Sequence, residues 1–331
     1  MPPSSHQLDP HDIRVFSGSS HRALAAGIAA HLQVPLEDSR TRQFSNSNTY
    51  VQLGASVRSR AVFIVQSLSA PANEHLMELL MMLDIVRGAA AREVHAIIPY
   101  FSYARSDKKD APRISITARL VADLLKTAGA THVMTMTLHS PQVHGFFDVP
   151  TDPLTARGLF MEHFQKTWPE RDLREAIVIA PDAGRARSAA RFAKMLDLPT
   201  IAAEKTRISD KEVKMGELIS KQVKGFRRAI IYDDEIASGG SVIKLSELLI
   251  ENGVQQITAV CTHGVFTGNA IENLAAIPQI TEIVTTDTVP IPLEKRAPHM
   301  TVLSVAPIFG EAIRHNYFRE SIGDLFSFWE D

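Results

Sequence analysis

The sequence predicts an α/β protein with two doubly wound domains, each built around a parallel sheet. Short runs of strand-forming apolar residues alternate with longer segments of helical period along the chain. The apolar runs are nearly continuous, which is typical of strands that are buried on both faces of a parallel sheet. The length of 331 residues is sufficient for two such sets.

The expected strands, in chain order, are Ile13–Phe16, Ala61–Gln66, Val94–Pro99, His132–Leu138, Ala176–Ala180, Arg228–Tyr232, Gln256–Cys261, Glu282–Thr285 and Thr301–Val305. Amphipathic segments between them predict helices, among them Asn73–Gly88, Ile116–Ala128 and Ala186–Leu196. We expect the first domain at residues 1–155 and the second at 156–305. A C-terminal helix at 306–331 is expected to pack back on the first domain.

Composition argues against several classes of protein. The formal net charge is -2, so the whole chain offers no charge pattern for nucleic acid or a membrane surface, and we expect neither as a partner. The polar, Pro-rich start does not resemble a signal peptide, and no apolar run is long enough to cross a bilayer. The single cysteine, Cys261, lies in an apolar run, which predicts a buried, inert thiol and a cytoplasmic location.

Charged or Gly-rich loops follow four of the predicted strands, and ligands gather at the carboxyl ends of such strands. The loop from Asp233 to Ser241 is the most informative, because two acids precede a Ser-Gly-Gly-Ser turn and an amphipathic helix. Backbone N–H groups of the turn and of the helix start can bind a phosphate. Asp233 and Asp234 can accept hydrogen bonds from sugar hydroxyls or bind hydrated Mg²⁺. An acidic helix cap is the alternative, and the position after a strand favours the phosphate site.

This loop resembles the ribose-phosphate loop of the ribose-phosphate diphosphokinase family, and the resemblance runs over nearly the whole chain. The family pattern of two Asp, a Thr, a Gly and a second Thr falls on Asp233, Asp234, Ser238, Gly240 and Ser241. The chain departs from the pattern at Ala237, where an acid is common, and at Glu235, where the residue is usually apolar. The resemblance implies that ribose 5-phosphate is bound by Asp182, Asp233, Asp234, Ala237, Ser238, Gly239, Gly240 and Ser241.

The segment Ile98–Arg105 is similar to the ATP-binding segment of the family, which implies ATP contacts for Arg105, Ser106 and Asp107. The loop Phe44–Asn48 corresponds to one that reaches the adenine of a neighbouring subunit. This correspondence assigns Phe44, Asn46 and Asn48 to the ATP site, and a stacking Phe with an amide suits a purine ring.

Two further motifs imply metal ligands. His139, in Thr137-Leu138-His139, stands where the family His binds the Mg²⁺ carried by ATP, and Thr137 replaces an Asp of that motif. Asp182, in Pro181-Asp182-Ala183-Gly184, matches an Asp that faces a second metal ion or the ribose.

The resemblance also implies the catalytic pair and a regulatory site. Lys205 and Arg207 match the two basic positions of the catalytic flexible loop, where cations stabilise the charge of a phosphoryl-transfer transition state. Ser56, Arg58, Ser321 and Phe326 match segments that shape an allosteric phosphate site in some members.

The implied protein has a fold of phosphoribosyltransferase type and is a homo-oligomer, hexameric or dimer-based. It transfers the diphosphoryl group of Mg·ATP to C1 of ribose 5-phosphate, with Mg²⁺ as cofactor. Two alternatives stay open. A phosphoribosyltransferase would share the Asp233–Ser241 loop but not the ATP segment. A catalytically weak regulatory or binding relative would carry departures such as Thr137 and Ala237.

Overall fold

The computed structural model describes residues 8–203 and 221–325, and it contains two six-stranded sheets in which every pairing is parallel. The fold class predicted from the sequence is confirmed. The first sheet has the order β2-β1-β5-β6-β7-β8, with bounds Leu36–Glu37, Ile13–Ser17, Ala61–Val65, Glu93–Ile98, His132–Met136 and Thr151–Leu154. The second has the order β10-β9-β11-β12-β13-β14, with bounds Thr200–Ala202, Ala176–Ala180, Arg228–Ile236, Gln256–Gly264, Ile280–Thr286 and Met300–Leu303.

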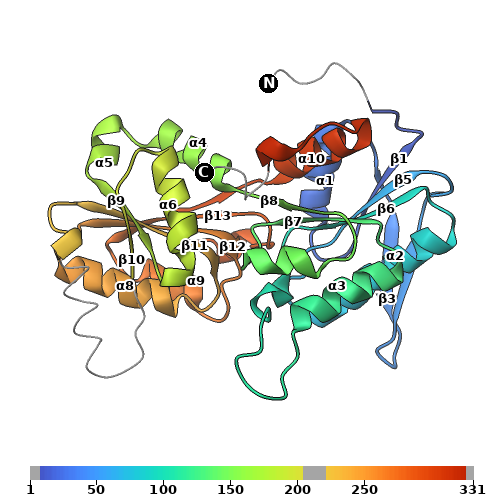
Figure 1. Cartoon of the computed structure of the whole chain (residues 1–331), viewed down its shortest axis with the longest axis horizontal. Helices are drawn as coiled ribbons and strands as arrows, with labels where there is room; N and C mark the ends of the chain where they lie inside the picture. Colours follow the sequence, from blue (N-terminus) through green and yellow to red (C-terminus); the bar gives the residue numbers. More distant parts are fainter. Residues whose placement is uncertain (1–7, 204–220, 326–331) are drawn as a thin grey trace.

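Helices cover both faces of each sheet (Figure 1). On the first sheet, α2 (Ala72–Gly88) and α3 (Thr117–Ala128) lie on one face, and α1 (Arg22–Leu32) and α10 (Ala306–Phe318) lie on the other. On the second sheet, α8 (Gly240–Glu251) and α9 (Ala270–Ala275) face α4 (Arg157–Thr167) and α6 (Ala186–Met195) across the strands. The short helix α5 (Glu170–Arg174) follows α4. An antiparallel hairpin, β3 (Ser39–Gln43) with β4 (Thr49–Leu53), extends from the first domain.

One apolar core continues from the first sheet to the second. It joins residues of α1 and α10 to aromatic residues of α4 and α6, including Phe160, Phe164 and Phe192, all of them fully buried. The ring of Phe192 stacks on Tyr232 of β11 at a centroid distance of 4.5 Å. Burying each such aromatic side chain stabilises the fold by roughly 1.5–3 kcal/mol, so the shared core fixes the two domains against each other.

The structure differs from the sequence-based boundaries at informative places. Strand β11 continues through both Asp residues to Ile236, four residues beyond its expected end, because pairing with β12 runs on to Gly264. Strand β7 ends at Met136 instead of Leu138, because Thr137 adopts a left-handed conformation with φ 42°. Strand β8 was not expected, because it contains Pro153 and proline disfavours strands. The proline is tolerated here because β8 lies at the edge of the sheet.

The helix expected at 306–331 ends at Phe318, where Arg319 adopts a left-handed C-cap conformation with φ 59°. Helix α10 packs tightly on α1: a Cβ added to Gly310 would lie 2.4 Å from Cδ2 of His31. His31 Nε2 in turn lies 2.8 Å from Glu311 Oε1. The division into domains near residue 155 stays a prediction.

Two expectations about single features can be compared with the structure. Cys261 is fully buried, so its predicted burial is confirmed, and burial raises the pKa of its thiol to about 12. Within the described residues, no helix combines the length and the apolar character needed to cross a bilayer.

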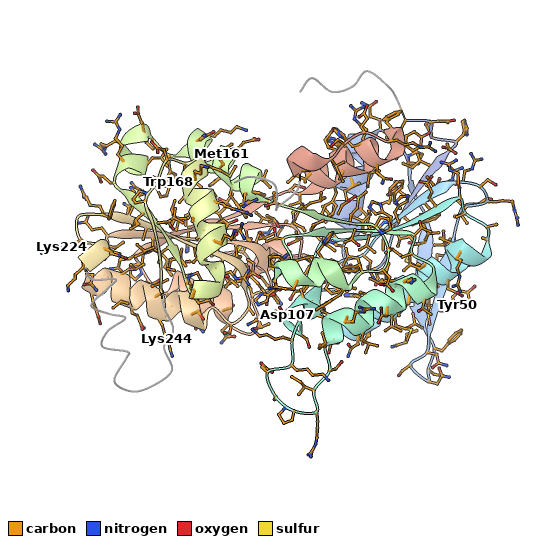
Figure 2. The ribbon with its side chains drawn as sticks, in the orientation of Figure 1. Tyr50, Asp107, Met161, Trp168, Lys224 and Lys244 are labelled. Atoms are coloured by element: carbon orange, nitrogen blue, oxygen red, sulfur yellow. The ribbon has the colours of Figure 1, made fainter. Side chains whose placement is uncertain are left out.

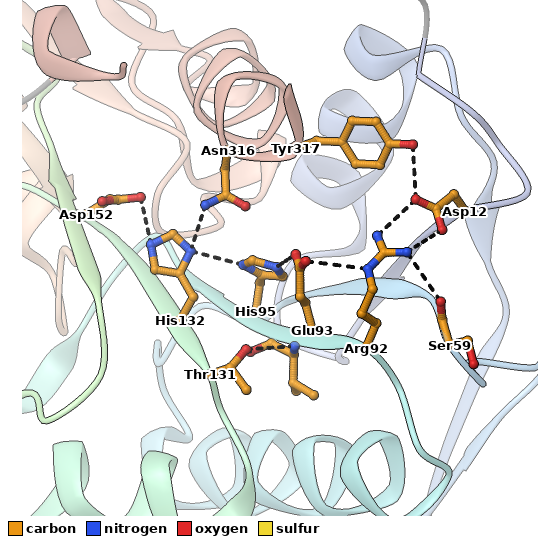
Figure 3. A network of polar contacts seen from close by, with 11 residues as sticks. Asp12, Ser59, Arg92, Glu93, His95, Thr131, His132, Asp152, Asn316 and Tyr317 are labelled. Carbon is orange, nitrogen blue, oxygen red and sulfur yellow. Dashed lines mark hydrogen bonds and ion pairs between the residues drawn. The ribbon is translucent and has the colours of Figure 1, made fainter. Parts of the chain in front are cut away.

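A chain of polar contacts fixes α10 to the amino-terminal end of the first sheet (Figure 3). Register places His95 of β6 beside His132 of β7, with the two Nδ1 atoms 3.0 Å apart. Glu93 and Asp152 flank this histidine pair, at 3.2 Å from His95 Nε2 and 2.8 Å from His132 Nε2. Asn316 of α10 contacts His132 Nδ1 at 3.3 Å.

A second set of contacts extends the network to the first strand of the sheet. The Tyr317 hydroxyl donates to Asp12 Oδ2 at 3.1 Å, and Arg92 binds both oxygens of Asp12 at 2.7 and 2.9 Å. Helix α10 is therefore held by polar contacts at its end as well as by the apolar packing on α1.

The histidine pair predicts a pH dependence of stability. Burial lowers the pKa of His95, so the unfolded chain binds its proton more readily, and the stability that His95 contributes is lost as pH falls through its ordinary pKa of about 6.5. We expect the Tm to fall less steeply from about pH 7.5 to about pH 5.5 in His95→Gln than in the wild type. Scanning calorimetry measures this slope, and His11→Gln, at an exposed histidine, is the control. Equal slopes for His95→Gln and the wild type would contradict the prediction.

Candidate functional site

A pocket of about 160 Å³ lies where the carboxyl ends of β6 and β7 face those of β9 and β11. Residues from both sheets line it, because parallel strands deliver all their C-terminal loops to one edge. They are Arg105, His139, Asp182, Arg185, Asp233, Asp234, Glu235, Ile236, Ala237, Ser238, Gly239, Gly240, Ser241 and Val242. The structure thus brings residues from the ribose-phosphate, metal and ATP assignments into one pocket.

The carboxylate of Asp234 is one contact point between the two domains. Its Oδ2 lies 2.8 Å from His139 Nδ1, which comes from the loop after β7. The same oxygen lies 3.4 Å from Arg185 Nη1, on the segment after β9, and the Arg185 guanidinium also donates to the backbone oxygen of His139. Asp234 and Arg185 are both largely buried, so each charge depends on the other for compensation.

The adjacent acids Asp233 and Asp234 differ in their surroundings. Burial, with the nearby charge of Asp234, raises the pKa of Asp233 well above its usual value. Burial alone would raise the pKa of Asp234 too, but the hydrogen bond with His139 and the charge of Arg185 outweigh it and hold that pKa well below its usual range. The pair therefore holds one firmly ionised carboxylate beside one that is more easily protonated.

The turn after β11 has the geometry of an anion site. Gly239 is the N-cap of α8 and has φ 77°, a left-handed conformation that glycine adopts without strain. Helix α8 starts directly at Gly240, so its first turn directs backbone N–H groups and the positive end of the helix dipole toward the pocket. The arrangement is suited to a phosphate group, as the sequence predicts.

A second cross-domain contact set involves Glu235, at the end of β11. Its Oε2 accepts a hydrogen bond from the hydroxyl of Tyr100 at 3.1 Å, and its Oε1 lies 3.3 Å from Arg105 Nη1. The ring of Tyr100 packs on His263 of β12, with centroids 4.9 Å apart. His263 Nε2 lies 3.1 Å from the backbone oxygen of Thr137, so the same set of contacts also holds the loop that carries His139.

The residues of the pocket fit a divalent cation that is held mainly by the phosphates of a bound substrate and only partly by protein side chains. The bond between His139 Nδ1 and Asp234 orients the imidazole and leaves Nε2 as the nitrogen for a metal ion. Asp182 uses Oδ1 to accept from the backbone N–H of Arg185 at 3.1 Å, and within the described ranges 8–203 and 221–325 its Oδ2 is the oxygen that remains. Within residues 8–203 and 221–325, no three His, Cys, Asp or Glu side chains are grouped closely enough to hold an ion. A cation such as Mg²⁺, which keeps several waters and substrate phosphates, does not need such a group.

Other predicted ATP residues do not line this pocket. Phe44, Asn46 and Asn48 lie at the exposed turn of the β3–β4 hairpin, where the Phe44 ring is 6.1 Å from that of Tyr50. The Ser106 hydroxyl accepts from the backbone N–H of Thr117 at 3.2 Å and so supports the start of α3. Figure 2 shows Asp107 on the loop before α3 and Tyr50 on the hairpin, in separate places.

The assigned regulatory residues lie elsewhere. Ser56 and Arg58 line a second pocket, of about 310 Å³, between β4 and α2. Ser321 follows α10, and its backbone oxygen lies 2.6 Å from His315 Nδ1. Lys205, Arg207 and Phe326 lie outside the described residues.

Sequence reasoning missed Arg185 of the pocket and understated two residues, Tyr100 beside the pocket and Glu235 within it. Arg185 was not considered, although a basic residue directly after Pro-Asp-Ala-Gly at a strand end is a usable indication of an anion or carboxylate partner. Tyr100 was noted only as part of a motif. Glu235 was noted only as a departure from a pattern, because its partners lie far away in the sequence.

Comparison with known proteins gives consistent matches. Residues 13–129 match the family model for the N-terminal domain of ribose phosphate pyrophosphokinase, and 214–327 match that of the phosphoribosyl synthetase-associated domain. A putative ribose-phosphate pyrophosphokinase of Streptomyces coelicolor is 48% identical over 315 residues, covering 95% of this chain and 98% of the relative. The ribose-phosphate pyrophosphokinase of Deinococcus radiodurans is 45% identical over 316 residues, covering 95% and 97%. The crystal structure of phosphoribosylpyrophosphate synthetase from Mycobacterium smegmatis superposes with a TM-score of 0.84 at 36% identity, covering 93% of this chain and 99% of that one.

The different surroundings of the two acids predict different costs of substitution. Asp234→Asn removes the charge that compensates buried Arg185 and should lower the free energy of unfolding by roughly 3 kcal/mol. Asp233→Asn keeps an oxygen to accept from the backbone N–H of Asp234, a bond of 2.8 Å, and should cost less than about 1 kcal/mol. Chemical denaturation of both variants measures the two costs. Equal losses would show that the charge of Asp234 does not compensate buried Arg185.

Proposed function

The chain belongs to the ribose phosphate pyrophosphokinase family, and we propose that it transfers the diphosphoryl group of Mg·ATP to C1 of ribose 5-phosphate. The products are 5-phosphoribosyl 1-diphosphate and AMP. The observation that carries the proposal is the single pocket that combines the phosphate-binding turn before α8 with His139, Asp182 and Arg105. A relative 48% identical over 95% of the chain supports the same reaction.

In this proposal, the second domain binds the sugar phosphate. The 5-phosphate occupies the turn of Ser238, Gly239, Gly240 and Ser241, where backbone N–H groups and hydroxyls donate hydrogen bonds. The carboxylates of Asp233 and Asp234 accept from the hydroxyls of the ribose. The cross-domain bond of Asp234 to His139 keeps the sugar subsite next to the nucleotide subsite.

The first domain binds the nucleotide. Arg105 binds phosphate oxygens through its guanidinium, and His139, together with Asp182 of the second domain, would hold Mg²⁺. When bound, Mg²⁺ neutralises charge on the phosphate oxygens of ATP. Phe44, Asn46 and Asn48 are exposed on the hairpin, which supports a contact to the adenine bound by a second copy of the chain.

The transfer is an in-line displacement at the β-phosphorus. The oxygen of the C1 hydroxyl forms the new P–O bond, the bond from the β-phosphorus to the oxygen of AMP breaks, and the hydroxyl proton passes to solvent. Positioning of the two substrates supplies much of the rate. Lys205 and Arg207 stabilise the charge that builds up on the phosphoryl oxygens.

The assembly and the location are part of the same proposal. A homo-oligomer, hexameric or dimer-based, brings the hairpin of one copy to the nucleotide of another. A cytoplasmic location fits an enzyme that uses ATP, and the buried thiol of Cys261 fits a reducing compartment. Ser56, Arg58, Ser321 and Phe326 remain the candidates for an allosteric phosphate site.

The function is tested by AMP release from Mg·ATP. We expect AMP only when ribose 5-phosphate is present, and a loss in kcat of roughly 10²–10³-fold in the double variant Lys205→Ala/Arg207→Ala. The KM for ribose 5-phosphate should stay close to that of the wild type, because the lost contacts belong to the transition state. Lys224→Ala, at an exposed lysine, is the matched control. A wild type that binds nucleotide but releases no AMP would identify a regulatory relative.

A further prediction concerns Thr137, which replaces a family Asp and is β-branched in a left-handed conformation, φ 42°. Asp adopts this conformation more readily than Thr. Thr137→Asp should lower the Mg²⁺ concentration for half-maximal rate and should not lower the Tm. Initial rates over a Mg²⁺ series and a thermal melt measure the two effects. An unchanged Mg²⁺ requirement would show that no carboxylate is missing at this position.

A further inference from the structure

Glu235 is the third acid in a row at the end of β11, and the proposed transfer gives it no task. Its side chain is only 9% exposed. Each of its oxygens contacts a residue on the segment after β6 of the first domain: Oε2 accepts from the Tyr100 hydroxyl at 3.1 Å, and Oε1 lies 3.3 Å from Arg105 Nη1. Burying a carboxylate costs free energy unless the charge is paired, so these two contacts are needed to compensate Glu235 where the domains meet.

Arg105 depends on this carboxylate for its position. Its side chain is 60% exposed, and in the part of the chain that the structure describes its ion-pair partner is Glu235. An exposed arginine samples many rotamers, and binding must order it. An anchor on Nη1 fixes the side chain and leaves the other guanidinium nitrogens to bind phosphate oxygens.

Glu235 is itself held rigidly from behind. The Tyr100 ring packs on His263, whose Nδ1 lies 2.9 Å from Thr288 Oγ1 and whose Nε2 lies 3.1 Å from the oxygen of Thr137. Burial and the charge of Glu235 raise the pKa of Tyr100, so its hydroxyl remains a hydrogen-bond donor. A rigid carboxylate is a better anchor than one on a mobile side chain, because it fixes the direction of the ion pair.

We propose that Glu235 is a positioning residue that holds the guanidinium of Arg105 in place for the phosphate chain of the nucleotide. The proposal rests on the proposed function for the identity of the ligand. The pattern that this loop resembles has an apolar residue at this place, which could not form the ion pair. A residue of the second domain therefore positions the arginine with which the first domain binds the nucleotide.

The central experiment compares wild type with Glu235→Gln, which keeps an oxygen for Tyr100 and removes the charge that holds Arg105. We expect the Kd for a non-hydrolysable ATP analogue and the KM for ATP each to rise about fivefold, with kcat within about twofold of wild type. Glu282→Gln removes a carboxylate that pairs with His163 at 2.9 Å away from the pocket, and it should change neither constant. If Glu235→Gln fails to fold, Glu235→Asp, which draws the carboxylate back, should raise the same Kd.

A double-mutant cycle separates positioning of Arg105 from a general structural role. In an Arg105→Ala background, Glu235→Gln should leave the Kd for the analogue unchanged, because its effect passes through the missing side chain. An unchanged or tighter Kd for Glu235→Gln in the wild-type background would overturn the proposal, as would an equal loss in both backgrounds. The titrations need no turnover. A wild type that binds the analogue but releases no AMP refutes the proposed function and still allows the role of Glu235 to be decided.

Discussion

The buried charge of Asp234 is the interaction on which the arrangement of the pocket depends. A carboxylate at this depth must be compensated, and its compensation comes from His139 of one sheet and Arg185 of the other. The two carboxyl edges therefore face each other at a fixed separation. The turn before α8, the imidazole of His139 and the guanidinium of Arg105 then surround one volume, instead of forming two half-sites on separate domains.

The sequence predicted the parts of this arrangement that depend on local chemistry. Continuous apolar strands separated by amphipathic helices are sufficient to predict parallel sheets, and the loops that follow the strands can then be expected at one edge of each sheet. A site for a sugar phosphate could be assigned to Asp233, Asp234 and the Gly239–Gly240 turn from residue types alone. The turn exposes backbone N–H groups to a phosphate, and the carboxylates can bind sugar hydroxyls or Mg²⁺. The conformation of Gly239, φ 77°, agrees with the use of glycine at that turn.

What could not be predicted depends on partners far apart along the chain. Arg185 and Glu235 acquire their importance from His139 and Arg105, which are 46 and 130 positions away, and no local pattern encodes such pairs. Strand β11 was expected to end before the acids, because Asp and Glu are depleted in strands, whereas pairing with β12 extends it to Ile236. The β3–β4 hairpin has mostly polar, exposed residues, so its strands lack the apolar pattern of the two sheets.

The packing of α10 on α1 has a consequence for the order in which the chain can fold during synthesis. The apolar side of α1, with Leu24 and Ile28, is covered by Phe309 and Ile313, which leave the ribosome only after the whole second domain has been made. At typical elongation rates this delay is on the order of ten seconds. During that time the first domain carries an uncovered apolar surface, which a chaperone can bind and which invites aggregation. The close fit between Gly310 and His31 can therefore form only after the second domain has left the ribosome.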